Sequence, residues 1–417
     1  MTGGKMIYHK RNSCRACEGL RLRKFLELGP QPLANSFLQS PDEFTDEARY
    51  PLDVYFCEDC SLVQILDVID PEVLFRQYLY ITGTSETIAT HNREYARAVV
   101  DKLSLGADDL VVEIASNDGS LLKCFKPYGV KTLGIEPATN IAEMAVKIGV
   151  ETANKFFNSD TAEEVRKSYG PARVVIGNNV LAHVNDTQDF LRGCASLLSE
   201  DGLLIIEAPY LRDLLDRVAY DTIYHEHHCY FSATSLKRLC EATGLIVTQI
   251  DRLPVHGGTL RLFAGLRARP ESNVIEIESM IEAERLADMN DFSRYEKLAS
   301  DTAANRADIL ELLEGMKREG KTVAGYGAPA KGNTLLNYCG ITTDLLPYTV
   351  DRSSLKIGLF TPGTHIPVLP ASALLERQPD YALILAWNFA EEIMRQQQEY
   401  RERGGRFIIP IPIPKVV

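Results

Sequence analysis

Short apolar runs alternate with helical stretches through the middle of the chain. The helical stretches include residues 139–149 and 187–199. The apolar runs occupy residues 109–116, 131–137, 172–182 and 201–209. This alternation predicts parallel strands joined by crossover helices, with ligands bound at the carboxyl edge of the sheet. We therefore expect an α/β domain of the nucleotide-binding type.

The last third of the chain repeats this pattern after an acidic, alanine-rich helical stretch at 275–320. An apolar strand enters a turn with Gly325 and Gly327, and Lys331 follows at a helix start. More strand-like runs lie at 346–353, 365–370, 381–388 and 406–412. A glycine turn with a lysine suits a phosphate, and a solvated helix lysine is the alternative. Two Rossmann-like halves imply two ligands, or one ligand clamped between domains.

Four of the nine cysteines form two C-x-x-C pairs near the N-terminus, Cys14 with Cys17 and Cys57 with Cys60. Each pair places two thiolates on one tight turn, and two such turns supply the tetrahedral four-sulfur shell that zinc favours in structural sites. Two redox or buried dithiol pairs are the alternative. Because four sulfurs close the shell, we expect a structural Zn2+ with no catalytic position.

Composition narrows the class of protein. With 417 residues, 45% of them apolar and 24% charged, the chain is a globular protein of two or three domains. A net charge of -12 argues against binding of nucleic acid or of an anionic membrane surface. The N-terminus lacks a secretory signal and no run approaches about 18 apolar residues, so we expect a cytoplasmic location.

Acidic residues end the first two strands of the central domain. The run LVVEIASNDGSLL carries Glu113 before the turn Asn117-Asp118-Gly119, and Glu136 follows the next strand in GIEPA. A carboxylate suits a cationic or hydroxylated ligand, whereas a phosphate loop offers glycines and a helix start. Glu136 could accept hydrogen bonds from both ribose hydroxyls of an adenosine, and Gly119 allows close backbone approach. This arrangement is typical of folds that bind S-adenosylmethionine, and two exposed carboxylates are the alternative.

The densest group of reactive side chains is YDTIYHEHHCYF, residues 220–231, with three of the eight histidines. Residues 224–228 cannot all lie on one face of a regular element, so several must point into a cleft or find buried partners. A histidine beside a carboxylate suits general-base catalysis. A surface cluster or a metal site is the alternative, although the zinc pattern HExxH is absent.

Two further groups lie where a doubly wound sheet or its flanking loop would face a substrate. Asn178 and Asn179, with His183 shortly after them, end another central strand. Tyr78 and Tyr80 lie in QYLYITGTS. Packing is the alternative role for the two tyrosines.

Together these motifs resemble the zinc-containing, S-adenosylmethionine-dependent nucleotide-sugar C-methyltransferases of deoxysugar biosynthesis. The resemblance covers essentially the whole chain through CRAC, PLANSF, FCEDC, EIASNDGSLL, GIEPA, NNVLAHV, IYHEHHCYFS, HGGTLR, GYGAPAKGNTLLN, VDRSSLKIG and PGTHIP. It implies an α/β protein with a small N-terminal zinc-binding module at 1–75 and a central Rossmann-like class I methyltransferase domain at 76–270. A helical linker and a C-terminal Rossmann-like domain that helps hold the nucleotide sugar would occupy 271–417.

We accordingly expect four sets of site residues. The zinc ligands would be Cys14, Cys17, Cys57 and Cys60. The cofactor S-adenosylmethionine would contact Glu113, Asn117, Gly119, Glu136, Asn178 and Asn179. The catalytic set would be Tyr78, His183, Tyr224, Glu226 and His227. The substrate would also contact Tyr80, Asn35, Lys331 and Asn333, although Tyr78 and Tyr80 align about equally well with the family position.

Methylation of carbon requires a base, because carbon becomes a nucleophile only after its proton is removed. The substrate that the resemblance implies, a nucleotide-diphosphate-linked 4-keto-deoxysugar of the dTDP type, carries a ketone next to that carbon. We expect His227, oriented by Glu226, to take the proton, while Tyr224 and His183 donate hydrogen bonds to the enolate oxygen. Methylation is expected at C3, with C5 left open.

Two other functions remain in view. An NAD-dependent nucleotide-sugar oxidoreductase could use GYGAPAKG as its dinucleotide site, but that turn lacks the full G-x-G-x-x-G spacing. A non-catalytic zinc-module protein would bind only a partner protein. The sequence leaves open the sugar, the nucleoside and the oligomeric state, for which a monomer is one candidate.

Overall fold

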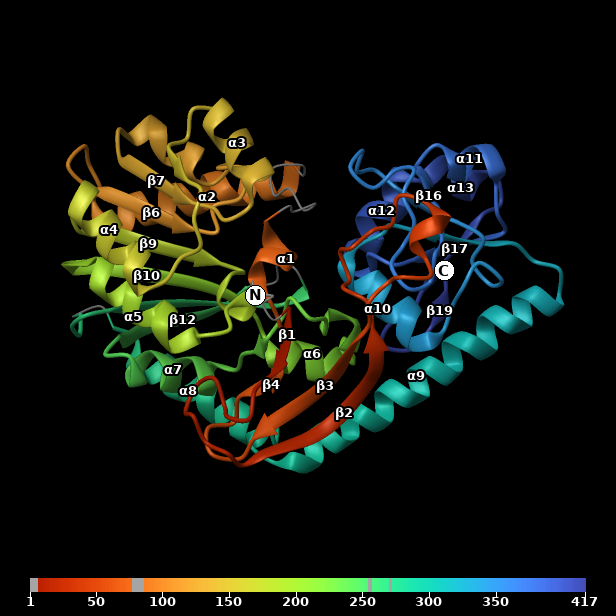
Figure 1. The fold of residues 1–417 in the computed structure, drawn as a ribbon, viewed down its shortest axis with the longest axis horizontal. Coiled ribbons are helices and arrows are strands. Elements are labelled where there is room, and N and C mark those ends of the chain that lie inside the picture. Colours follow the sequence, from red (N-terminus) through yellow and green to blue (C-terminus); the bar gives the residue numbers. More distant parts are fainter. Residues whose placement is uncertain (1–6, 77–85, 254–256, 270–271) are drawn as a thin grey trace, which may run out of the picture.

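The computed structural model describes residues 7–76, 86–253, 257–269 and 272–417 (Figure 1). The N-terminal sheet lies along the lower edge of this view, between the central domain and the C-terminal domain, and the long helix α9 (Phe292–Arg318) runs beside it. Tyr78 and Tyr80 lie outside the described residues, so their predicted roles stay predictions. Within the described ranges, no helix combines the length and the apolar character needed to cross a membrane.

The N-terminal sheet combines strands from two distant parts of the chain. Its order is β11-β4-β3-β2, formed by β2 (Leu22–Gln31), β3 (Tyr50–Cys57), β4 (Val63–Ile65) and β11 (Cys229–Tyr230). β1 (Tyr8–Lys10) pairs separately with β5 (Asp67–Ile69), and α1 (Pro71–Phe75) follows. β11 belongs to the histidine-rich segment and pairs antiparallel with β4, with Cys229 opposite Gln64. One end of the predicted catalytic segment is therefore part of the N-terminal sheet.

The central domain is built on a seven-stranded sheet in the order β12-β13-β10-β9-β6-β7-β8. The strands are β6 (Leu110–Ile114), β7 (Lys131–Ile135), β8 (Thr152–Ala153), β9 (Ala172–Asn178), β10 (Leu198–Pro209), β12 (Ile246–Leu253) and β13 (Thr259–Gly265). The five from β10 to β8 are parallel, as the sequence predicts, and β13 is antiparallel to both of its neighbours. Every residue of β6 is buried, which explains its continuous apolar run.

Helices cover both faces of this sheet because alternate residues of each strand point to opposite sides. On one face, α2 (Glu86–Leu103), the 3-10 turn η3 (Leu122–Tyr128) and α3 (Thr139–Lys147) pack on residues that include Val111 and Ile176. On the other face, α4 (Ser159–Tyr169), α5 (Thr187–Leu197) and α7 (Ala233–Ala242) pack on residues that include Val112 and Val175. The predicted α/β class is thus confirmed.

A second, mostly parallel sheet forms the C-terminal domain, as the repeated strand pattern predicts. Its order is β16-β15-β14-β17-β18-β19, from β14 (Val323–Tyr326), β15 (Thr349–Asp351), β16 (Val368–Pro370), β17 (Tyr381–Ile384), β18 (Arg406–Ile409) and β19 (Lys415–Val416). Its helices are α10 (Ala330–Cys339), α11 (Ala373–Arg377), α12 (Ala390–Gln396) and α13 (Gln398–Glu402). α6 (Leu211–Arg217) and α8 (Val274–Leu286) precede α9, which connects the central and C-terminal domains.

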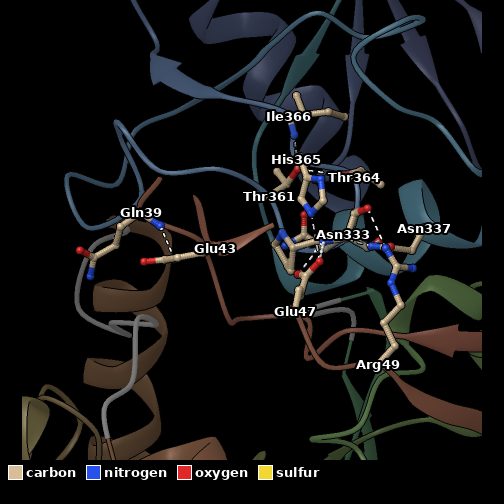
Figure 2. A network of polar contacts seen from close by, with 12 residues as sticks. Gln39, Glu43, Glu47, Arg49, Asn333, Asn337, Thr361, Thr364, His365 and Ile366 are labelled. Atoms are coloured by element: carbon tan, nitrogen blue, oxygen red, sulfur yellow. Dashed lines mark hydrogen bonds and ion pairs between the residues drawn. The ribbon is translucent and has the colours of Figure 1, made fainter. Parts of the chain in front are cut away.

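A segment of the N-terminal module, residues 33–49, lies on a loop of the C-terminal domain (Figure 2). Both carboxylate oxygens of Glu47 accept the backbone N–H of Gly363, at 2.8 and 3.0 Å, and Oε2 lies 3.1 Å from His365 Nε2. Arg49 donates to the Gly363 carbonyl at 2.9 Å. These contacts fix the N-terminal segment to the C-terminal domain, so parts of the chain more than three hundred residues apart are in direct contact.

The four predicted zinc ligands come together beside the N-terminal sheet. Their Sγ atoms all lie within 4.8 Å of one another, with 3.5 Å between Cys14 and Cys60 and 3.6 Å between Cys17 and Cys57. A tetrahedral Zn2+ with bonds of about 2.3 Å needs sulfur–sulfur separations of about 3.8 Å, so this thiol set fits the metal. Gln64 donates to Cys14 Sγ at 3.1 Å, which links the metal shell to the strand that pairs with β11.

We expect Cys60→Ser to lose the metal and to destabilise the protein, because the energy of metal binding contributes to folding of such sites. The wild type should contain about one Zn2+ per chain by elemental analysis, and the variant less than about a fifth of that, with a melting temperature at least about 5 °C lower. Cys124→Ser is the matched control, since Cys124 lies outside the four-cysteine cluster. A full equivalent of zinc in Cys60→Ser would contradict the assignment.

Candidate active site

The carboxyl edge of the central sheet holds a buried carboxylate with an unused oxygen. Glu113 of β6 is 6% exposed, and its Oε2 has no hydrogen-bond partner among the described residues. Burial raises the pKa of Glu113 well above its usual value, and the negative charges of Asp118, Glu136 and Glu207 add to this. A buried carboxylate without a partner favours a positively charged ligand. The ammonium and sulfonium groups of S-adenosylmethionine fit this requirement.

Glu136 ties the ends of the first two central strands together. Its Oε2 accepts the N–H of Asn117 at 2.9 Å, and its Oε1 accepts the N–H of Ala138 at 2.8 Å. Burial raises the pKa of Glu136, although the two N–H groups oppose this. We expected both oxygens to serve ribose hydroxyls; they also hold the turn, and each oxygen keeps a second lone pair for a ligand. Contact of Asn117 and Glu136 with the cofactor stays a prediction.

Gly119 is needed by the turn itself. Its φ is +74°, and a Cβ at this position would lie 3.0 Å from Val150 Cβ and 3.2 Å from Ala145 Cβ. The missing side chain therefore lets the turn pack against Ala145 and Val150. We had expected the missing side chain to make room for a ligand instead. A role of Gly119 in cofactor binding stays a prediction.

A row of polar side chains lies beside this carboxylate, and its members Tyr95, Glu207 and Arg261 were not found from the sequence, unlike Asn178 and Asn179. Glu207 of β10 lies opposite Arg261 of β13, and Arg261 Nε donates to Glu207 Oε1 at 2.7 Å. The Arg261 guanidinium lies 4.1 Å from the ring centroid of Tyr95, whose hydroxyl donates to Asn178 Oδ1 at 3.4 Å. Asn179 N–H donates to the Glu207 carbonyl at 2.8 Å. The signal was available, because an acid interrupts the apolar run LLIIEAP just as one interrupts LVVEIAS.

His227 is held as a neutral ring in one tautomer. Its Nδ1 lies 2.8 Å from the carbonyl oxygen of Thr222, which can only accept, so Nδ1 carries the proton. Its Nε2 lies 2.8 Å from the Tyr224 hydroxyl and accepts that hydrogen bond. Burial lowers the pKa of His227 to about 4. The ring is therefore neutral near pH 7, with a basic lone pair on Nε2.

One expected role, that of Glu226, needs correction at this point, whereas the contact of Tyr224 with an enolate oxygen stays a prediction. The carbonyl of Thr222 orients the His227 ring, whereas we had assigned this role to Glu226. The Glu226 carboxylate instead accepts hydrogen bonds from Asn35 Nδ2, at 2.8 and 3.0 Å. The Tyr224 hydroxyl, expected to face an enolate oxygen, donates to His227. A backbone acceptor could not be identified from the sequence, because every residue has a carbonyl.

His183 stands beside this pair at the end of the 3-10 turn η4 (Leu181–His183). Its ring centroid lies 4.8 Å from that of His227 and 5.6 Å from that of Phe75. Within the described part of the chain, its buried Nδ1 has no hydrogen-bond partner. Burial, with a contribution from His227, lowers the pKa of His183 well below its usual value. The structure thus brings His183, Tyr224 and His227 together, as a neutral polar group.

The two expected substrate residues of the C-terminal domain lie at the start of α10. Asn333 Nδ2 donates to the carbonyl of Ala34 at 2.8 Å, while its buried Oδ1 has no partner in the ranges that the structure describes. Lys331 Nζ donates to Asn388 Oδ1 and lies 4.3 Å from the ring centroid of Trp387. Burial lowers the pKa of Lys331 to about 8. Lys331 is half-buried and held by neighbours, unlike a solvated helix lysine.

Three family models match successive parts of the chain. A zinc binding domain matches residues 14–75, a methyltransferase domain matches 88–250, and a C-methyltransferase C-terminal domain matches 254–412. The first of these contains all four clustered cysteines, and the second contains the edge with Glu113 and the loop with His227.

Known proteins and solved structures show similar segments. A ubiquinone biosynthesis O-methyltransferase of Rhodopseudomonas palustris is 30% identical over 98 residues, which are 23% of this chain and 38% of that protein. The structure of magnesium protoporphyrin IX methyltransferase from Synechocystis PCC 6803 with bound S-adenosylmethionine aligns with 43% of this chain and 81% of its own, at 14% identity and a TM-score of 0.32. The mitomycin 7-O-methyltransferase aligns with 42% of this chain and 53% of its own, at 18% identity and a TM-score of 0.33.

One relative matches nearly the whole chain. The C-methyltransferase NovU of Streptomyces niveus is 39% identical over 406 residues, which are 97% of this chain and 97% of that protein. A match of this extent decides against the oxidoreductase and the non-catalytic alternatives. The chain belongs to the family of S-adenosylmethionine-dependent C-methyltransferases that carry a zinc-binding domain.

Proposed function

We propose that this C-methyltransferase adds a methyl group at C3, next to the ketone, of a nucleotide-linked 4-keto-deoxysugar of the dTDP type. The supporting observation is the neutral His227 ring, whose Nδ1 proton is bound by Thr222 and whose Nε2 is basic. Methylation of oxygen or nitrogen does not require removal of a proton from carbon, because those atoms carry lone pairs that can attack the methyl group. A ketone beside the target carbon makes its proton acidic enough for an imidazole to remove.

Tyr224 controls access to this base. In the present arrangement its hydroxyl donates to Nε2 of His227 and so covers the lone pair. When the hydroxyl turns to donate to the ketone oxygen instead, Nε2 becomes free to take the neighbouring proton, and the oxygen gains a donor as its charge develops. One such donor contributes about 3 kcal/mol to the transition state. His183 is the second group proposed to contact that oxygen, which is supported by its neutral ring and by an Nδ1 atom without a partner among the described residues.

The edge with Glu113 would hold the cofactor. S-adenosylmethionine supplies a methyl group on a positively charged sulfur. Glu113 offers an unpartnered oxygen, within the described ranges, to a cationic part of that cofactor. Asn117, Glu136, Asn178 and Asn179 remain the proposed contacts to its other groups. The burial of this edge strengthens a charge–charge interaction relative to water.

The nucleotide part of the substrate would be held between the N-terminal and C-terminal domains. Lys331 provides a cation at the start of α10 for the diphosphate. Asn333 offers an unused Oδ1 from the same helix, as judged over the described residues, and its amide already contacts the segment that carries Asn35. One ligand would then contact three domains, with proposed boundaries at 1–75, 76–270 and 271–417.

The choice of substrate is tested by incubating the protein with S-adenosylmethionine and a panel of dTDP-, UDP- and GDP-linked sugars, followed by mass spectrometry. We expect the mass of one CH2 group to be added only to 4-keto sugars, and NMR of the product to place the methyl on C3. The matched control is the same sugar with a hydroxyl in place of the ketone, which has no acidic C–H bond. Methylation of that control, or of an oxygen, would refute the proposal.

The base is tested by proton exchange at the carbon next to the ketone, in deuterium oxide with S-adenosylhomocysteine present. We expect His227→Asn to slow this exchange at least about 100-fold, because the basic Nε2 is lost. His225→Asn is the control: the same substitution two residues earlier affects a ring that contacts the Pro51 carbonyl, on the side of the N-terminal module. Exchange at the wild-type rate in His227→Asn would rule out this base.

The pH dependence of exchange follows from the lowered pKa of His227. The active form is the neutral ring, so a pKa of about 4 keeps nearly all of the base available at pH 5.5. We expect the exchange rates at pH 5.5 and pH 7.5 to agree within about twofold, whereas an ordinary imidazole with a pKa of about 6.5 would lose about tenfold. Melting temperatures at both pH values serve as the control for stability. A tenfold loss with an unchanged melting temperature would show that the ring has an ordinary pKa.

A further inference from the structure

The segment just before the proposed base is held by the C-terminal domain. The 3-10 turn η5 (Tyr220–Thr222) packs on α10. Tyr220 is fully buried, and its hydroxyl donates to Asn305 Oδ1 on α9 at 3.0 Å. Its ring lies edge-on to Tyr338 of α10, with 5.2 Å between the centroids. The position of η5 therefore depends on the C-terminal domain.

Asp221 adds a polar contact at the centre of this interface. Its side chain is fully buried, and Oδ2 accepts the indole N–H of Trp387 at 2.6 Å. Its Oδ1 has no hydrogen-bond partner in the part of the chain that the structure describes. Burial raises the pKa of Asp221 to about 6, although the charge of Lys331 opposes this. Burying a carboxylate costs free energy that its contacts only partly offset, so stability alone does not account for an acid at this position.

The next residue connects this contact to the base. Thr222 follows Asp221 directly, and its carbonyl holds the Nδ1 proton of His227 at 2.8 Å. We infer that Asp221 is a positioning residue: its hydrogen bond to Trp387 fixes η5, and η5 fixes the carbonyl that sets the tautomer of His227. This inference rests on the proposed role of His227 as the base.

The effect of losing this contact follows from the geometry. If the Thr222 carbonyl moves by about 1 Å, the ring of His227 is no longer held at one angle, and the proton distributes between its two nitrogens. Part of the population then lacks a basic Nε2 facing the substrate. Misplacement of this size costs up to about 100-fold in rate. Binding of the cofactor does not involve this carbonyl and is expected to be unaffected.

Two substitutions separate the hydrogen bond from the rest of the side chain. Asp221→Asn keeps an oxygen that accepts the indole N–H, whereas Asp221→Leu has a similar size and no acceptor. We expect Asp221→Leu to lower kcat by about 30- to 100-fold, with Kd for S-adenosylhomocysteine changed less than about twofold. KM for the keto-sugar nucleotide should change alike in Asp221→Asn and Asp221→Leu, because both remove the charge that acts on Lys331. Asp221→Asn should keep at least about a third of the wild-type kcat.

The tautomer is observed directly by 15N NMR of histidine-labelled protein without substrate, with the signal of His227 assigned from His227→Asn. We expect Nδ1–H in the wild type and in Asp221→Asn, and a mixture of tautomers in Asp221→Leu. Trp387 is the chain's single tryptophan, so its fluorescence reports whether the surroundings of residue 221 are intact. Trp387→Phe removes the donor from the other side and should reproduce the loss of kcat, with zinc content as the measure of folding.

The inference would be overturned if Asp221→Leu kept the wild-type kcat and the wild-type tautomer of His227. It would also be overturned if Asp221→Leu changed KM alone, or if kcat fell equally in Asp221→Asn and Asp221→Leu. If Asp221→Leu does not fold, Trp387→Phe decides, and a normal kcat and tautomer in that variant refutes the role. The NMR measurement needs no substrate, so the two proposals fail separately. Absence of exchange with every keto sugar in the wild type refutes the proposed function, whereas an unchanged tautomer refutes the role of Asp221.

Discussion

The proposed base depends on one main-chain acceptor, which fixes the direction in which the histidine ring presents its lone pair. The Thr222 carbonyl binds the Nδ1 proton of His227, which places the lone pair on Nε2 toward Tyr224. Burial disfavours the charged imidazolium, so the ring stays neutral without a neighbouring cation. Much of the surrounding structure holds that carbonyl and that ring in place.

The histidine-rich segment, residues 220–231, is held in place by contacts with all three parts of the chain. Its start, at Tyr220 and Asp221, is held by the C-terminal domain. In its middle, the N–H of His228 donates to the carbonyl of Ala182 in the central domain at 2.7 Å. Its end is β11, a strand of the N-terminal sheet. All three parts of the chain therefore contribute to the position of this segment.

Much of the fold was predictable from the sequence, because buried parallel strands are apolar throughout and paired cysteines at short spacing identify a metal shell. The run LVVEI became β6, and the four cysteines form one cluster. The missed contacts have a different origin. The Thr222 carbonyl and the N–H groups that bind Glu136 belong to the backbone, which is the same in every residue. The contact of Asp221 with Trp387 joins positions 166 residues apart, and no spacing rule relates them.

The participation of β11 in the N-terminal sheet constrains how such enzymes can diverge. Exchange of the first domain between two relatives would replace the partner of Cys229 and Tyr230 while leaving those residues behind. In such a chimaera, β11 would pair with a β4 strand from a different protein, directly beside the proposed active site. Recombination at the domain borders is therefore unfavourable in this architecture unless the β11 segment is exchanged together with the first domain.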